Sequence, residues 1–182
     1  MTRINISNFT RKLEALRKTY KNLPTEIAAI AVNFSKDRFV EQAWEDETKE
    51  PWKPRKRPRR GKTGKITKNQ TLLVKTGRLK RSIRKISATE NKIIIGTDVA
   101  YAQIHNEGGT ITGTASVKAH QVKEHARNRK GRKEKVKAHT VKAHTKKMNT
   151  RIPQRQFMGN SKALQNKIIS HITAQFERAL NT

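Results

Sequence analysis

The strongest constraint on the fold of this 182-residue chain is the block 72–109, which is dense in residues with narrow backbone preferences. Thr76-Gly77 predicts a turn or a helix cap ahead of an apolar pattern. The consecutive Ile93–Ile95 are typical of a buried strand, because β-branched side chains suit a pleated surface. The Gly108-Gly109 pair permits backbone angles and close approaches that other residues resist. The block therefore predicts a part of the chain that is important for the fold. It contains no recognisable set of catalytic residues.

Apolar spacing predicts longer helices on either side of this block. Apolar residues at alternating intervals of three and four, from Ile6 to Tyr20, form a narrow stripe on a helix that ends at Asn22-Leu23-Pro24. A second helix follows, with a wide apolar face that suits packing on a sheet, and it ends at Glu45-Asp46-Glu47. Large apolar residues at intervals of four over 164–180 predict a C-terminal helix.

Shorter elements are predicted within the block itself. They are a turn and helix over 76–83, strands over 83–88 and 92–97, and a helical turn over 99–106. We therefore expect an α+β fold, in which two N-terminal helices and a C-terminal helix pack on a mostly antiparallel sheet.

The acidic cluster 45–47 lies near a predicted helix C-terminus, where the helix dipole disfavours negative charge. We therefore expect a basic neighbour beside it, either from segment 53–68 or from another subunit.

Positive charge is concentrated in two segments. The chain has 42 Lys and Arg against 14 Asp and Glu, a net charge of +28. Segment 53–68 has nine of the basic residues and no acidic one, and segment 118–147 has twelve against Glu124 and Glu134. Such charge favours an acidic partner, either nucleic-acid phosphate or an acidic protein surface.

Both basic segments are predicted to be insertions in a single domain that spans 1–182. Prolines among the basic residues make 51–69 an extended loop. In 112–149 the sequence VKAHQVKEH is repeated as VKAHTVKAH, with a turn-like segment at Lys130-Gly131 between the copies. If the chain folds back there, residues whose numbers sum to 261 face each other, so that Val117 meets His144. We infer a long basic β-hairpin arm; disorder in the free protein is the competing interpretation.

Several classes of site are disfavoured by composition and spacing. The chain has no cysteine, which excludes disulfides and cysteine-ligated metals, and no run as long as a membrane span. The four histidines of the repeat are spaced so that neither pair on one strand chelates locally. His105 has no nearby nucleophile, and we expect a structural hydrogen bond from its imidazole. A nuclease would need clustered acids for metal ions. We expect no enzymatic activity, no cofactor and no metal.

The order of the motifs resembles a known family. TGRL-x2-SI is followed by a strand that ends in IGT, then by YA-x-IH-x2-GG and by IP-x-R-x-FMG. This order is similar to the phage virion morphogenesis and tail-completion proteins, which include Mu G-like proteins and head–tail joining proteins. The resemblance is strong over 72–109 and 152–159 and weaker elsewhere.

The resemblance implies a structural virion protein of a tailed phage, assembled in the host cytoplasm. It would act at the head–tail junction (neck or connector) or in tail completion, as a ring-forming homo-oligomer. Its partners would be the portal or connector and the tail-terminator or tail-tube proteins. The alternative function is a non-specific nucleic-acid-binding protein whose core is only similar to the family.

The basic segments give the candidate contact residues, either with phage DNA or with an acidic ring surface. They are Arg55, Lys56, Arg57, Arg59, Arg60, Arg127, Arg129, Lys130, Arg132 and Lys133. Trp52 could stack on a base or cover the end of the sheet, and we favour the second role. Arg155 and Phe157 form either a docking contact or an anchor of the C-terminal helix, with Phe157 in the core.

Overall fold

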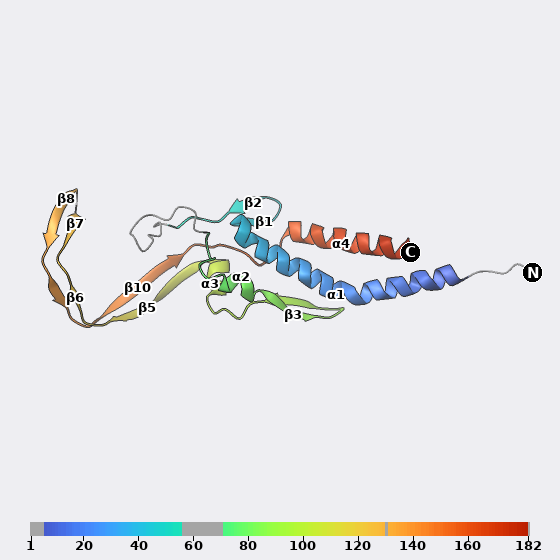
Figure 1. The fold of residues 1–182 in the computed structure, drawn as a ribbon, viewed down its shortest axis with the longest axis horizontal. Coiled ribbons are helices and arrows are strands. Elements are labelled where there is room, and N and C mark those ends of the chain that lie inside the picture. The colour runs from blue at the N-terminus through green and yellow to red at the C-terminus, as the bar shows by residue number, and fades with distance from the viewer. Residues whose placement is uncertain (1–5, 56–70, 130, 182) are drawn as a thin grey trace, which may run out of the picture. The chain divides into compact units, whose positions relative to one another are not determined.

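The computed structural model describes residues 6–55, 71–129 and 131–181 (Figure 1). The chain divides into two compact units. The first, which we call the body, consists of residues 1–108 and 153–182. The second, the arm, is Gly109–Ile152. Helices at both ends of the chain and antiparallel strands between them confirm the predicted α+β class.

Two long helices form the frame of the body. Helix α1 spans Ser7–Glu41 and helix α4 spans Lys162–Leu180. They lie side by side and antiparallel (Figure 1): Nε2 of His171 is 2.8 Å from Oε2 of Glu26, and Nζ of Lys167 lies 5.1 Å from the centre of the Phe34 ring. The predicted C-terminal helix is confirmed, and the Ser161 side chain caps it by accepting from the backbone N–H of Leu164 at 3.1 Å.

The predicted break between two N-terminal helices is wrong, because α1 is one helix of 35 residues with Pro24 inside it. A proline in a helix costs about 3 kcal/mol through its lost N–H and its clash with the preceding turn. Burying one large apolar side chain contributes about 1.5–3 kcal/mol. Leu23, Phe34 and Phe39 are all buried along α1, so the packing of one continuous helix outweighs the cost of its proline.

Short elements fill the rest of the body. Strands β1 (Ala43–Glu45) and β2 (Lys49–Pro51) form one antiparallel pair, and β3 (Arg84–Ala88) and β4 (Ile93–Gly96) form another. Helix α2 is Arg78–Ser82 and α3 is Ala102–Glu107. The elements predicted within the 72–109 block are thus confirmed, with bounds that differ by a few residues, although β4 is half-buried rather than buried. The described strands form five separate two-stranded sheets in place of one.

The core brings together residues from distant parts of the chain. Phe39 contacts Trp52 edge-on, with ring centres 5.5 Å apart, and Phe157, with ring centres 5.0 Å apart. Leu79, Ile83, Val99 and Ala102 complete the buried cluster. The predicted core role of Phe157 is confirmed. Trp52 also lies in this core, beyond the sheet-covering role that the sequence favoured.

The acidic cluster acquires cations from inside the body. Helix α1 ends at Glu41, and Glu45 belongs to β1. Nη2 of the fully buried Arg38 lies 2.6 Å from Glu45 Oε2 and 3.2 Å from Glu41 Oε1. Lys49 pairs with Glu41 at 2.7 Å. A basic neighbour is therefore present, but α1, β2 and α4 provide it, since Nζ of Lys167 also lies 4.0 Å from Glu45 Oε2. Most of the predicted partner segment, 56–68, lies outside the described residues.

The arm is a three-part β-hairpin, which confirms the predicted fold-back. From base to tip its ladders are β5 (Gly109–Val117) with β10 (His144–Ile152), β6 (His120–Val122) with β9 (His139–Val141), and β7 (His125–Arg129) with β8 (Arg132–Val136). The register is the predicted one: Val117 faces His144, His120 faces Val141, and Val122 faces His139. Gly131 turns the chain at the tip with a φ of 81°.

Candidate assembly surfaces

A small polar clamp joins the two sequence blocks that suggested the family. Asn106 of α3 accepts hydrogen bonds through Oδ1 from the backbone N–H groups of Phe157, at 3.0 Å, and Met158, at 2.9 Å. Its Nδ2 donates back to the Met158 carbonyl at 3.0 Å. One side chain thus satisfies three backbone groups of the segment 153–158. Sequence reasoning missed Asn106, because its partners lie about fifty residues away along the chain.

Two further side chains tie the same segment to the chain around Trp52. Nε1 of Trp52 donates to the Gln156 carbonyl at 2.8 Å. Arg155 donates to the Lys53 carbonyl through Nε, at 3.1 Å, and through Nη2, at 2.9 Å. The Arg155 side chain is therefore an internal anchor, and its exposed fraction of only 7% leaves little of it for a docking contact.

One ring nitrogen of His105 lacks the predicted hydrogen bond within the described part of the chain. The expected hydrogen bond from its imidazole is absent at Nδ1, which is buried without a partner among the described residues. Burial first, and then the nearby Arg155 guanidinium, lower the pKa of His105 below its ordinary value of 6.5. The ring contacts Tyr101 edge-on, with ring centres 5.9 Å apart. Its backbone carbonyl accepts from Arg155 N–H at 2.8 Å, so the residue contributes to the clamp through its main chain.

The ten predicted contact residues do not form one site. Arg55 belongs to the body, where Nη2 donates to the Thr71 carbonyl at 3.2 Å. Arg127 is paired with Glu134 at 3.0 Å, on the arm. Arg132 faces Arg129 across the tip, and Lys133 faces Asn128. The other predicted contacts lie outside the described residues: Lys56, Arg57, Arg59, Arg60 and Lys130.

The arm also contains a shorter repeat that the sequence reasoning overlooked. The unit Val-Lys-x-His occurs four times, starting at 117, 122, 136 and 141. In every copy Nδ1 of the histidine lies 3.0–3.1 Å from the carbonyl oxygen of the lysine two residues earlier. The β-ladder is interrupted at the two residues between each valine and histidine, on both strands. Two joints result, one on each side of the β6–β9 ladder (Figure 1).

The comparison with known protein families matches residues 4–177 to the phage virion morphogenesis family. The chain belongs to this family. The match extends well beyond the blocks 72–109 and 152–159 and confirms the family that they suggested. No curated protein and no solved structure matches the chain significantly.

Membership in the phage virion morphogenesis family gives this chain a structural or assembly role in a phage particle. None of the helices that the structure describes is long and apolar enough to cross a membrane. Among the described residues, no group of three or more His, Asp or Glu side chains is placed to hold a metal ion. Because the family acts in virion assembly, the surfaces of interest are those that can contact other components.

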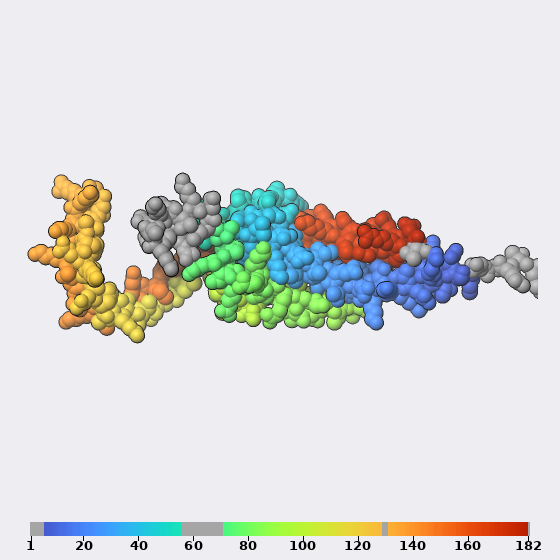
Figure 2. All heavy atoms as spheres, in the orientation of Figure 1, coloured from blue at the N-terminus to red at the C-terminus, as the bar shows by residue number. Residues whose placement is uncertain are grey.

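The clearest such surface on the body of this virion morphogenesis protein is the N-terminal end of α1. There α1 continues past the C-terminal end of α4, and its side chains are left uncovered on the face in view (Figure 2). The predicted stripe lies on this end: Ile6 is 65% exposed, Phe9 69% and Tyr20 53%. An exposed apolar row of this kind makes this end of α1 a candidate interaction surface.

Proposed function

We propose that this protein is a structural component of a tailed-phage virion, acting at the head–tail junction (neck or connector) or in tail completion as a ring-forming homo-oligomer. Its neighbours along the particle axis would be the portal or connector on one side and tail-terminator or tail-tube proteins on the other. The family supports the virion role. The observation that carries the oligomer is the uncovered apolar end of α1.

The stripe on α1 has an intramolecular partner along only part of its length. Farther along the helix Leu23 and Phe34 are buried, whereas Ile6 and Phe9 are exposed. A lone helix end of a few turns is marginal in water, since helices gain most of their stability from packing of an apolar face. A contact with another chain would cover the stripe and stabilise this end.

Charge argues that this contact joins two different surfaces. Residues 7–22 contain five Lys and Arg and one acid, Glu14. Two such ends facing each other would repel. Residues 37–50, at the other end of α1, contain six acids, of which Glu41 and Glu45 are paired within the body. The other four are exposed, as is Val40: Asp37, Asp46, Glu47 and Glu50. A basic apolar end and an acidic end on one chain favour a head-to-tail contact, which closes into a ring when the rotation between subunits permits.

The test of the ring is the mass of the particle in solution. Light scattering coupled to size exclusion, with negative-stain imaging, is expected to give a discrete ring for the natural chain. Phe9→Asp is expected to abolish the ring while far-UV circular dichroism stays unchanged, because Phe9 is already exposed in the single chain. Asn8→Asp adds the same charge beside the stripe and is the matched control. Equal behaviour of the two variants would argue against this surface.

A second measurement is needed if the ring forms only on another part of the assembling particle. If the purified chain is monomeric, the same two variants are compared in phage production. Tailed particles are then counted by electron microscopy. We expect heads without joined tails for Phe9→Asp and complete particles for Asn8→Asp. Complete particles from both variants would contradict the proposed contact.

A further inference from the structure

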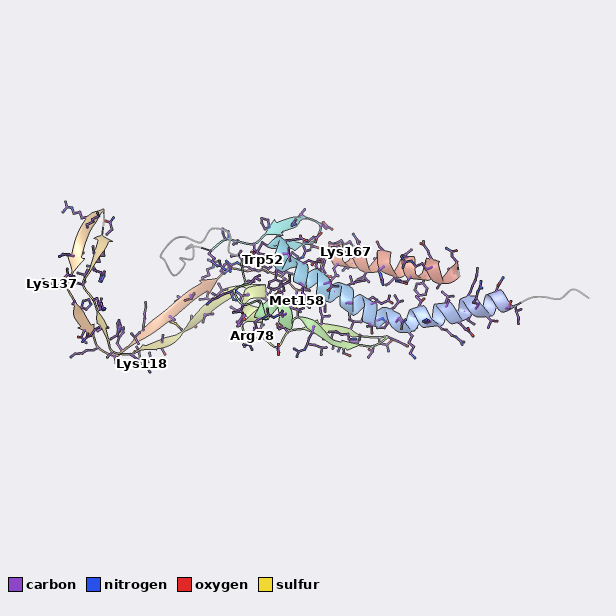
Figure 3. All side chains as sticks on the ribbon, viewed as in Figure 1. Trp52, Arg78, Lys118, Lys137, Met158 and Lys167 are labelled. Atoms are coloured by element: carbon purple, nitrogen blue, oxygen red, sulfur yellow. The ribbon has the colours of Figure 1, made fainter. Side chains whose placement is uncertain are left out.

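We propose that the arm binds the phosphate backbone of duplex DNA, through lysines that its two joints hold in place. The first joint contains Lys118 and Lys142, and the second contains Lys123 and Lys137. We call each pair a lysine rung. Figure 3 labels one lysine of each rung, Lys118 between β5 and β6 and Lys137 between β8 and β9.

The two rungs are surrounded by the same residue pairs and the same contacts. A valine–histidine pair closes each joint on both sides: Val117 with His144 and His120 with Val141 close the first. Val122 with His139 and His125 with Val136 close the second. In every copy the histidine ring also contacts the carbonyl of the rung lysine, at 3.0–3.1 Å. The lysine main chain is therefore fixed, while the ammonium groups stay in solvent.

The charge of the arm is not compensated within it. Its sequence, 109–152, has thirteen Lys and Arg and only two acids. Glu134 pairs with Arg127 at 3.0 Å, and Glu124 pairs with Lys135 at 3.1 Å. Neither of these acids is paired with a rung lysine. At the tip, Arg129 and Arg132 occupy facing positions.

The composition of the arm favours phosphate over an acidic protein. Protein interfaces concentrate aromatic residues at their energetic centres and are depleted of lysine. The arm has nine lysines and no Phe, Tyr or Trp. It therefore has none of the large aromatic rings on which proteins most often stack the bases of single strands. Lysines along a narrow ribbon suit the continuous phosphates of a duplex, whose neutralisation releases counterions.

The spacing of the rungs fits the duplex. Lys118 and Lys123 are five residues apart on one strand, as are Lys137 and Lys142 on the other. At about 3.3 Å per residue, five residues span about 17 Å. A turn of B-DNA rises about 34 Å and presents two backbones to any one side, so a backbone passes about every 17 Å on average. One lysine of each rung can therefore meet one of two successive backbone crossings, because side chains five residues apart on a strand point to opposite faces of the ribbon. No base is read in this geometry, and binding is independent of sequence.

DNA binding by the arm does not depend on the proposed ring, because all the charge lies within one chain. Loss of the ring in Phe9→Asp with DNA binding intact, or the reverse, would separate the two proposals.

The test uses the full-length chain and a labelled duplex of about 30 base pairs, with anisotropy measured over a series of salt concentrations. We expect tight binding at low salt and a steep linear fall of log K with log salt. Replacing all four rung lysines by Gln should make that slope shallower by about 2, since one lysine of each rung contacts the duplex and each phosphate contact contributes about 0.9. Replacing one rung should give about half of this change. The single-rung variants keep the test informative if the fourfold variant does not fold.

The matched control removes four exposed lysines from the body: Lys75, Lys85, Lys92 and Lys162. These Lys→Gln changes lower the net charge equally, and we expect them to change the slope by less than about 1. Equal slopes for the rung and control variants would overturn the proposal, as would the absence of duplex binding. Tighter binding of a single strand, or equally effective competition by poly-glutamate, would also overturn it. The latter result would assign the arm to an acidic protein.

Discussion

Asn106 and Met158 are joined by a reciprocal pair of hydrogen bonds: the Met158 N–H donates to Asn106 Oδ1 at 2.9 Å, and Asn106 Nδ2 donates to the Met158 carbonyl at 3.0 Å. The same oxygen also accepts from Phe157 N–H. The arm separates these residues in sequence, so this pair closes the body around the insertion. The pair resembles the reciprocal hydrogen bonds between two antiparallel strands, with the Asn106 side-chain amide in place of one backbone.

Asn106→Ala is expected to destabilise the body by about 2–4 kcal/mol, because it leaves two N–H groups and one carbonyl of the segment 153–158 without partners. Urea denaturation followed by circular dichroism measures this loss. Gln103→Ala is the control on the same helix, since its hydrogen bond to Glu107 is exposed, and it should cost less than about 0.5 kcal/mol. A similar loss of unfolding free energy in both variants would show that the Asn106 hydrogen bonds stabilise the body no more than an exposed one does.

Gly108→Ala is expected to destabilise the body by about 1–3 kcal/mol. Gly108 has a φ of 75°, and a Cβ there would lie 2.8 Å from the backbone nitrogen of Gln154. Both the backbone angle and the close approach therefore exclude a side chain. Gly113→Ala serves as control, because nothing lies within 4 Å of the Cβ that it would add. Thermal unfolding of the two variants in parallel decides whether the position or the residue type matters.

Much of the fold could be predicted because the signals were local or symmetric. Ile93–Ile95 indicated their strand through side-chain shape alone. The register of the arm followed from a repeat folded about one turn, since an antiparallel pairing has a constant residue sum. In contrast, Pro24 misled the prediction because the energy that keeps it helical comes from packing against other segments, which no local pattern shows.

The candidate site was harder to predict for the same reason. Charge alone selected the basic residues, but Arg127 is matched by Glu134 across the arm, and its contacts were invisible until the register was known. The predicted contact residues did not include the rung lysines, although the Val-Lys-x-His repeat is visible in the sequence. Asn106 offered no signal, because an amide in a polar stretch is ordinary until its backbone partners are brought to it.

His105 is expected to make stability depend on pH near neutrality. Its pKa is lowered in the folded chain, chiefly by burial, so the unfolded chain binds the proton more readily. Stability should therefore fall as the pH drops through the ordinary histidine value of 6.5 and recover above it. His105→Leu removes both this titration and the unpartnered Nδ1, so denaturation midpoints between pH 5 and pH 7.5 should become flatter. His144→Leu, a change on the arm, should leave the pH dependence of the body as it was.

Glu41 is expected to make the stability of the body depend on pH in a lower range. The hydrogen bond from Lys49 is the largest cause that lowers the pKa of Glu41 below its ordinary value of 4.5, and the Arg38 charge adds to it. Because the folded chain holds this carboxylate ionised more strongly than the unfolded chain does, the stabilisation is complete above pH 4.5 and is lost as the pH falls through the folded pKa. Lys49→Met should therefore weaken the acid dependence of the unfolding free energy below pH 4.5. Lys85→Met, on an exposed lysine of β3, is the control. An acid dependence that is identical in both variants would assign the loss to other carboxylates.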